Sequence, residues 1–533
     1  MIFKSPYPDV VVPNVHVTEH VLRDVPSHKD KTALVDALTG AKITFGELAV
    51  AIRRTAGALA ARGLEKGDVV AIFSPNTITY PVAFHGTALA GGVVTTVNPT
   101  YTAGELASQL RDSKARFLVT LGAFLDKAKE AAAESEVQEV FTFDGAPGST
   151  PFAELMAGPE IASPPAVDPA KDVVALPYSS GTTGISKGVM LTHRNLVANM
   201  VQLKGTDSLC RAITERDTLS AVLPFFHIYG LGVIMNYALS RGATLVVFQR
   251  FDLEQYLSAI QTHRITFSHL VPPILVALAK HPLVDQYDVS SLEGIMSGAA
   301  PLGGELAHAV EKRLGCVVGQ GYGLTETSPV THTAPNQRIG QTPHDAIGPS
   351  LPNTEIMIVD VETGHALGPG EPGEVWIRGP QVMMGYLGQP GATGVTIDKD
   401  GWLHTGDIGT VDQHGLCRIV DRVKELIKFK GFQVAPAELE AILLTHPSIK
   451  DAAVVRSPDE EAGEVPKAFL VTDGSLSEHD VLAWVAERVS PHKKVRRVEF
   501  VDAIPKSPSG KILRRILIER ELASDAERAE KSI

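Results

Sequence analysis

Cysteine is scarce in this sequence. Only three cysteines occur in 533 residues, Cys210, Cys316 and Cys417, and long stretches of chain separate them. An odd number without close spacing excludes a disulfide framework and a zinc site built on paired cysteines. The sequence therefore predicts a protein of a reducing compartment, and we expect a cytoplasmic location.

An excess of positive charge is also missing. The chain carries 49 Lys and Arg against 61 Asp and Glu, a formal net charge of −12. A nucleic-acid-binding protein needs a basic face to displace counterions, so nucleic acid is excluded as a partner. The one dense basic run, HKKVRR at residues 492–497, is predicted to be a solvated face, or alternatively a rim that attracts an anionic cosubstrate.

Long uninterrupted apolar runs are lacking as well. Residues 69–104 contain no Asp, Glu, Lys or Arg and a single histidine, His85. Prolines, glycines and asparagines interrupt this stretch, whereas a membrane span needs about 20 consecutive apolar residues. The N-terminal residues lack the sustained apolar core of a secretory signal. We therefore expect a buried core segment and no stable membrane insertion.

The chain is rich in β-branched runs that alternate with helical patterns. Its length and 44% hydrophobic content predict more than one domain, since single cores stop growing at roughly 250–300 residues. Strands are predicted at residues 68–74, 92–98, 115–120 and 244–248, and a helix at 103–114. This alternation predicts an α/β fold with mixed and parallel sheets covered by helices. From about residue 353 shorter strands and glycine turns predict a β-rich subdomain, and a boundary near 421–431 precedes a small α+β domain.

The segment YSSGTTGISKGV at residues 178–189 resembles a phosphate-binding loop without being a Walker A loop. Its lysine, Lys187, follows Ser186 rather than a glycine, and strands are predicted on both sides. Glycines allow close backbone approach, and the hydroxyls and Lys187 could cradle a polyphosphate. A plain hairpin turn is the alternative.

Three further motifs carry candidate functional residues. In GQGYGLTETSP (319–329), Tyr322 suits stacking on a planar base and Glu326 suits a hard cation, or else caps a turn. In GWLHTGDIG (401–409), Asp407 is either a turn residue or a ligand of a ribose diol. In PKSPSGKILRR (505–515), Lys511 follows Gly510, where an exposed lysine is ordinarily only a surface charge.

Taken in order, these motifs resemble those of the adenylate-forming superfamily, which includes acyl- and aryl-CoA synthetases, peptide-synthetase adenylation domains and beetle luciferases. The series is YSSGTTGISKGV, SGAAPL, GYGLTET, LHTGDIG, DRVKELIKFKG and PKSPSGKILRR, over roughly residues 30–515. PFFHIYGL, QGYGLTE and FKGFQVAPAELEAILL are most similar to 4-coumarate:CoA ligases. The resemblance implies that a carboxylate attacks the α-phosphate of Mg·ATP to give an acyl-adenylate and pyrophosphate, and that coenzyme A then displaces AMP.

The resemblance also implies a nucleotide site. Contacts to the pyrophosphate portion are implied for Ser179, Ser180, Gly181, Thr182, Thr183, Gly184 and Lys187. The adenine slot would be lined by Gly298, Ala299, Ala300, Pro301, Gln320, Gly321, Tyr322 and Gly323. Thr325 would touch the α-phosphate, Glu326 and Thr183 would bind magnesium, and Asp407 and Arg422 would hold the ribose.

Catalytic, acyl-binding and domain-rotation roles follow from the same resemblance. Lys511 would bridge the carboxylate and the α-phosphate, and His227 would gate the acyl pocket. The acyl pocket would also include Ile228, Tyr229, Gly230, Gly298, Gly321 and Gly323. Lys428 and Gln433 would aid adenylation, and Lys430 and Gly431 would lie near the pantetheine tunnel. The implied domains are an N-terminal adenylation domain 1–421, a hinge 422–424 that contains Lys424, and a mobile C-terminal domain 425–533.

Some features leave the substrate and the regulation open. Coumarate ligases commonly carry cysteine where this chain has Trp376, and Gly230 and Gly232 would leave pocket room for a longer acid. A medium- or long-chain fatty acyl-CoA synthetase is therefore the main alternative to a hydroxycinnamate ligase. An amino-acid adenylation enzyme would need an acidic residue near His227, which residues 222–235 lack. A luciferase-like enzyme and a nucleotide sensor are more distant alternatives. Acetylation of Lys511 by an acetyltransferase, reversed by a deacetylase, would remove its charge, and we expect a monomer or homodimer.

Overall fold

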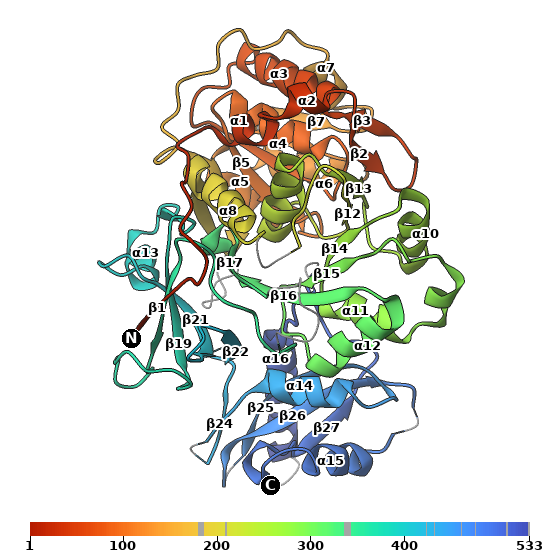
Figure 1. Ribbon diagram of the computed structural model, residues 1–533, viewed down its shortest axis with the longest axis vertical. Helices are drawn as coiled ribbons and strands as arrows, with labels where there is room; N and C mark the ends of the chain where they lie inside the picture. The colour runs from red at the N-terminus through yellow and green to blue at the C-terminus, as the bar shows by residue number, and fades with distance from the viewer. Residues whose placement is uncertain are drawn as a thin grey trace.

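The structure is a computed structural model, and the fold is shown in Figure 1. It describes residues 1–179, 186–207, 211–334, 343–422, 424–430, 432–459, 461–474, 476–507 and 510–530. Several predicted residues lie outside the described parts: Ser180, Gly181, Thr182, Thr183, Gly184, Cys210 and Gly431. The side chain of Gln433 is also outside them.

A mixed sheet forms the first half of the large domain, in the order β10-β11-β9-β5-β4-β6-β7-β8, with β20 against β11. Its strands are β4 (Val69–Phe73), β5 (Val93–Val97), β6 (Ala115–Thr120), β7 (Glu139–Thr142), β8 (Thr150–Pro151), β9 (Val173–Ala175), β10 (Tyr178–Ser179), β11 (Lys187–Thr192) and β20 (Gly385–Tyr386). Its helices include α3 (Phe45–Ala61), α4 (Tyr80–Leu89), α5 (Ala103–Ser113), α6 (Leu125–Ala133) and α7 (Phe152–Met156). The strands predicted at 68–74, 92–98 and 115–120 and the helix at 103–114 are confirmed. The apolar runs form strands because helices cover the sheet on both faces.

A second sheet follows the order β17-β16-β15-β14-β12-β13-β2-β3 and is parallel from β16 to β2. Its strands are β2 (Thr32–Asp36), β3 (Lys42–Thr44), β12 (Thr218–Ala221), β13 (Thr244–Val247), β14 (Phe267–Leu270), β15 (Gly294–Ser297), β16 (Val317–Gly323) and β17 (Val330–Thr333). The accompanying helices are α1 (Val17–Leu22), α2 (Val25–His28), α8 (His193–Gly205), the π-helix η2 (Tyr229–Tyr237), α9 (Ala238–Ser240), α10 (Leu253–His263), α11 (Pro272–Lys280) and α12 (Gly304–Leu314). The carboxyl ends of β15 and β16 carry the SGAAPL and GYGLTET motifs.

The β-rich subdomain predicted from about residue 353 is an antiparallel sheet, β1-β18-β19-β21-β22. Its strands are β1 (Ile2–Lys4), β18 (Glu355–Val359), β19 (Gly373–Arg378), β21 (Leu403–Val411) and β22 (Cys417–Arg422), with α13 (Pro390–Thr396) nearby. Figure 1 shows the N-terminus running to this sheet, where β1 pairs with β18. Trp376 stacks on His404 of the neighbouring strand at 3.7 Å between ring centroids, so its role in this sheet is packing.

The chain ends in a small α+β unit at the bottom of Figure 1. Its sheet has the order β24-β23-β26-β25, with β27 against β26. The elements are β23 (Ile427–Phe429), β24 (Phe432–Val434), α14 (Pro436–Leu444), β25 (Ile449–Asp459), β26 (Gly463–Thr472), α15 (Glu478–Ala486), β27 (Arg497–Phe500) and α16 (Arg514–Glu530). The Lys280 ammonium at the end of α11 donates to the carbonyl oxygens of Leu444 (3.3 Å) and Ile449 (3.1 Å), so the two domains are in contact.

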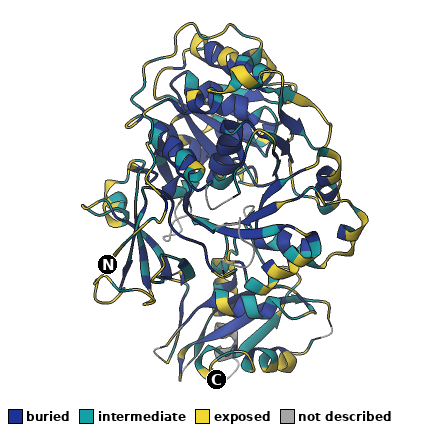
Figure 2. Ribbon diagram, in the orientation of Figure 1, coloured by how far each residue is buried: buried dark blue, intermediate teal, exposed yellow. Residues whose placement is uncertain are grey.

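The burial pattern places the core in the sheets of the large domain (Figure 2). The stretch around His85 belongs to it: β4, β5 and nearly all of α4 are buried. Among the described residues, no helix combines the length and the apolar character that crossing a bilayer requires.

Buried histidines make the fold sensitive to acid. Burial lowers the pKa of five histidines to about 3: His85, His193, His227, His269 and His332. An unfolded histidine has a pKa of about 6.5, so below that pH the unfolded chain binds protons that the folded chain does not. Each of these groups then lowers the free energy of unfolding by up to about 1.4 kcal/mol per pH unit between about pH 6.5 and 3.

We therefore expect the urea midpoint of unfolding to fall when the pH is lowered from about 7.5 to about 5.5. The raised pKa values of the buried carboxyls Asp407 and Asp421 act in the opposite direction, but they are fewer than the histidines. An unchanged midpoint between the two pH values would contradict the assignment of neutral buried histidines.

Candidate active site

The strands on either side of the phosphate-loop motif pair as a hairpin, which forms one wall of the site. β10 and β11 pair antiparallel, with Ser179 opposite Lys187, as the strands predicted around the loop require. The Ser179 hydroxyl donates to Glu326 Oε1 (2.9 Å), and the Lys187 ammonium lies over the Tyr386 ring, 4.9 Å from its centroid. The hairpin thereby brings Ser179 into contact with Glu326, the acidic residue of a distant motif, and Lys187 to Tyr386, which also binds Glu326.

Glu326 is a buried carboxylate with one oxygen already occupied. Its Oε1 accepts from Ser179 and from the Tyr386 hydroxyl (3.0 Å), and the residue is only 8% exposed. No hydrogen bond from the described residues reaches Oε2. A carboxylate oxygen next to hydroxyls is the donor set that a hard cation such as Mg²⁺ prefers, so the residues present fit this ion.

The SGAAPL and GQGYG motifs lie side by side because β15 and β16 are parallel neighbours. A Cβ on Gly298 would lie 2.8 Å from the Tyr229 ring, and Ala299 has a φ of +68°, so this turn is tightly determined. The Gln320 side chain accepts from the Leu302 amide (3.0 Å) and donates to the Leu302 carbonyl (3.2 Å), fixing the two segments together. The structure therefore brings together the residues predicted for an adenine slot.

Tyr322, Asp407 and Arg422 form a connected polar group. The Tyr322 hydroxyl donates to Asp407 Oδ2 (2.5 Å), and Arg422 Nε lies 3.3 Å from Asp407 Oδ1. Asp407 and Arg422 are register partners on β21 and β22. Burial raises the pKa of Asp407, and the Arg422 guanidinium opposes this rise. Asp407 is thus a sequestered acceptor with a cation beside it, rather than a turn residue.

His227 and Lys511 approach each other across the domain boundary. Burial lowers the pKa of His227 to about 3, and the Lys511 ammonium contributes to the same shift. Burial and the Arg422 guanidinium lower the pKa of Lys511, while the carboxylates of Asp407 and Glu326 raise it. Lys511 is therefore no ordinary surface charge: it is half-buried and interacts electrostatically with groups that the other motifs supply.

The residues next to Lys511 pack closely against the large domain and form ion pairs within the small domain. A Cβ on Gly510, whose φ is +80°, would lie 3.0 Å from the Val271 side chain of the large domain. Within the small domain, Arg514 pairs with Glu425 (2.7 Å) and with Glu440 (2.7 Å). The sequence analysis did not single out Arg514 or Tyr386. The arginine run in KILRR could have indicated Arg514, whereas nothing in the sequence around the two-residue strand β20 indicates Tyr386.

The prediction that Gly230 and Gly232 leave pocket room is wrong. A Cβ on Gly230 would lie 2.0 Å from the Pro224 carbonyl oxygen, and one on Gly232 would lie 3.0 Å from the Ser328 carbonyl oxygen. Neighbouring backbone occupies both positions, so these glycines allow close packing of η2. Among the other pocket residues, the Tyr229 hydroxyl contacts His269 Nδ1 (3.1 Å) and the Met296 carbonyl (3.3 Å), while Ile228 is buried in the core.

Most of the remaining predicted residues lie in the small domain or next to it. Lys424 and Lys428 are exposed, Lys428 pairs with Gln433 in the β23–β24 ladder, and the Lys430 ammonium forms an ion pair with Glu461. These contacts belong to the small domain itself. In the large domain, Thr325 begins the short 3-10 turn that contains Glu326.

Comparisons with known proteins agree with this geometry. Residues 22–387 match the family of AMP-binding enzymes, and residues 438–511 match the AMP-binding enzyme C-terminal domain. The chain is 43% identical to 4-coumarate–CoA ligase 1 of Petroselinum crispum, over 98% of each chain. It is 44% identical to a 4-coumarate–CoA ligase of Pinus taeda, over 97% of each chain. Among solved structures, ATP-bound MatB from Rhodopseudomonas palustris superposes with a TM-score of 0.86 at 30% identity, covering 95% of this chain and 99% of that one.

Proposed function

The chain belongs to the family of AMP-binding enzymes and is an AMP-forming acid–CoA ligase, and we propose that its acid is a hydroxycinnamate such as 4-coumarate. The enzyme uses ATP, Mg²⁺ and coenzyme A. The observation that carries the choice of acid is the identity of 43% and 44% to two 4-coumarate–CoA ligases over nearly the whole chain. The electrostatic interaction of Lys511 with Glu326 and Asp407, which come from distant motifs, supports the adenylation chemistry.

The first half-reaction joins two anions that repel each other, and the proposed site supplies positive charge that offsets this repulsion. The carboxylate oxygen bonds to the α-phosphorus while the bond to pyrophosphate breaks. Lys511, whose ammonium interacts electrostatically with Glu326 and Asp407, would bridge the carboxylate and the α-phosphate oxygens and offset their repulsion. Magnesium, held by Glu326, would neutralise charge on the phosphates.

The nucleotide would be held by the groups around these residues. We assign the ribose to Asp407 and Arg422, and the adenine to the wall formed by Gly298 and Tyr322. Ser179 and Lys187 would contact the pyrophosphate portion, since their hairpin stands beside Glu326. Thr325, which precedes Glu326, would touch the α-phosphate.

His227 would orient the acid as a neutral group. With a pKa of about 3 it carries no charge at physiological pH. Its Nδ1 accepts from the Tyr229 amide (3.3 Å), which leaves Nε2 to carry the proton. The carboxylate substrate is already ionised, so the step needs a donor that positions it and needs no general base.

The experiment that tests the substrate is acid-dependent AMP release from Mg·ATP and coenzyme A. A panel would run from acetate through octanoate to cinnamate, 4-coumarate and ferulate. We expect the highest kcat/KM with the hydroxycinnamates. Preference for the aliphatic acids would overturn the substrate assignment and make the enzyme a fatty acyl-CoA synthetase. AMP release that needs the acid but no coenzyme A would indicate a different acceptor.

The contact of Lys280 with the small domain gives a prediction about domain arrangement. Its two carbonyl acceptors lie at the end of α14 and the start of β25, so the contact exists only when the small domain sits as it does here. We propose that this arrangement serves adenylation and that the small domain, 425–533, rotates about 422–424 for thioester formation. Lys280→Ala is then expected to slow pyrophosphate release several-fold and to spare thioester formation from supplied acyl-adenylate.

The matched control is Lys312→Ala on the exposed side of α12, which is expected to change neither half-reaction. Equal slowing of both half-reactions by Lys280→Ala would contradict the role given to this contact.

We also propose that acetylation of Lys511 switches the enzyme off. Acetylation would remove the charge that the adenylation step needs. In the arrangement described here Lys511 is half-buried, so we expect movement of the small domain to make it more accessible to a modifying enzyme. Full activity of a stoichiometrically Lys511-acetylated sample would rule out this control.

A further inference from the structure

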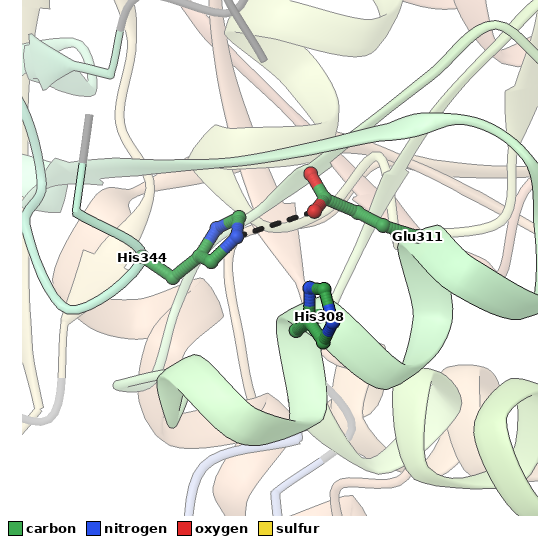
Figure 3. A group of neighbouring side chains, drawn as sticks. All are labelled: His308, Glu311 and His344. Carbon is green, nitrogen blue, oxygen red and sulfur yellow. Dashed lines mark ion pairs between the residues drawn. The ribbon is translucent and has the colours of Figure 1, made fainter. Parts of the chain in front are cut away.

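Three potential metal ligands gather on the large domain, outside the residues assigned to catalysis. They are His308, Glu311 and His344, and one ligand atom of each lies within 4.8 Å of the others. His308 and Glu311 are three residues apart on α12 and therefore share one face of that helix. Figure 3 shows the His308 ring standing on the helix below the His344–Glu311 pair.

Two of these side chains are already held in position. Glu311 is 13% exposed, and its Oε1 accepts from the Val318 amide (2.9 Å) on β16, which leaves Oε2 directed to His344. His344 is anchored through its backbone, because its carbonyl accepts from the Gln320 side-chain amide. His308 is exposed, and among the described residues no hydrogen bond or ion pair holds its ring.

The separation of the anchored pair matches metal coordination. His344 Nε2 and Glu311 Oε2 are 3.2 Å apart. In a tetrahedral zinc site with bonds of about 2.0–2.1 Å, neighbouring ligand atoms are about 3.3 Å apart. The pair already spans one edge of such a site, and a small rotation of the exposed His308 side chain would supply the third ligand. Water would take the fourth position.

We propose that His308, Glu311 and His344 form a binding site for a divalent transition-metal ion of the zinc type. Two imidazoles and one carboxylate suit Zn²⁺ or Co²⁺, whereas Mg²⁺ prefers oxygen ligands alone. The ligands of this site therefore differ in chemistry from those of the magnesium site that we assign to Glu326.

The position of the site gives the ion a structural consequence. Gln320 links His344 to Leu302, and Leu302 lies two residues before α12 begins at Gly304. An ion bound by α12 and His344 would add a direct link between these two segments, which Gln320 and Leu302 already connect indirectly. It would thus fix the segment around His344 to the wall that we assign to adenine.

The test is cobalt binding to the full-length, untagged and metal-stripped protein, with Mg²⁺ in excess. We expect one equivalent of Co²⁺ to give the intense visible absorption of a four-coordinate site, and Zn²⁺ to displace it. Glu311→Gln keeps an acceptor for the Val318 amide and removes the anionic ligand, so it is expected to fold and to weaken binding. His308→Ala changes an exposed side chain and should weaken binding by at least about tenfold, the loss that even outer partners of a metal cause.

The control is His414→Ala, an exposed histidine on the turn between β21 and β22, which should leave the cobalt spectrum unchanged. Absence of the absorption, or its persistence in both His308→Ala and Glu311→Gln, would overturn the proposal. The measurement uses neither acid nor nucleotide, so its outcome is independent of the proposed ligase substrate.

Discussion

Replacing Lys511 with alanine is expected to slow acyl-adenylate formation by roughly a thousandfold, the upper range for removing one preorganised charge-stabilising group. The half-buried ammonium interacts with Asp407, Glu326 and Arg422, and partial burial strengthens its effect on an anionic transition state. If the small domain presents Lys511 only in the adenylation arrangement, as we propose, thioester formation from supplied acyl-adenylate should be nearly unchanged. The measurement is single-turnover pyrophosphate release beside thioester formation.

Arg515→Ala is the matched control for this prediction. Arg515 is a basic residue close to Lys511 in the chain, and its only recorded ion pair among the described residues is an exposed one with Glu519. Its loss is expected to leave both half-reactions within about twofold, since exposed pairs contribute little. If Lys511→Ala reduced both half-reactions equally, the rotation of the small domain between the two steps would be contradicted.

Replacing Glu326 with glutamine is expected to lower kcat/KM by roughly a hundredfold and to raise the Mg²⁺ concentration needed for half-maximal rate. Glutamine has nearly the same shape and can still accept from Ser179 and Tyr386, so the variant removes the charge and keeps the packing. The measurement is the adenylation rate as a function of Mg²⁺ concentration.

Tyr386→Phe separates the charge of Glu326 from its hydrogen bonds. This variant removes one donor to Oε1 and leaves the carboxylate, so a loss of about tenfold or less is expected, with little change in the Mg²⁺ dependence. A Glu326→Gln enzyme with the unaltered Mg²⁺ dependence would contradict the assignment of Glu326 as a metal ligand.

The sequence predicted the elements whose pattern is local. β4, β5 and β6 are runs of apolar and β-branched residues, and α5 has a capping box at Thr102 and Glu105, so short-range chemistry specifies them. The two-residue strand β20 and the π-helix η2 were not predicted. Both depend on contacts outside their own segments: β20 on the distant strand β11, and the glycines of η2 on the backbone of the preceding Pro224 and of the distant Ser328.

The sequence by itself determined which chemical groups the protein can use, because hydroxyls, glycines, Glu326, Asp407 and Lys511 stand in motifs that are legible without coordinates. Only the tertiary structure decided their surroundings. The neutral state of His227 results from burial and from a lysine of the other domain, and the position of Lys511 depends on how the small domain packs. Spacing along the chain does not encode such proximities, because the free energy of these groups depends on which distant charges and how much water surround them.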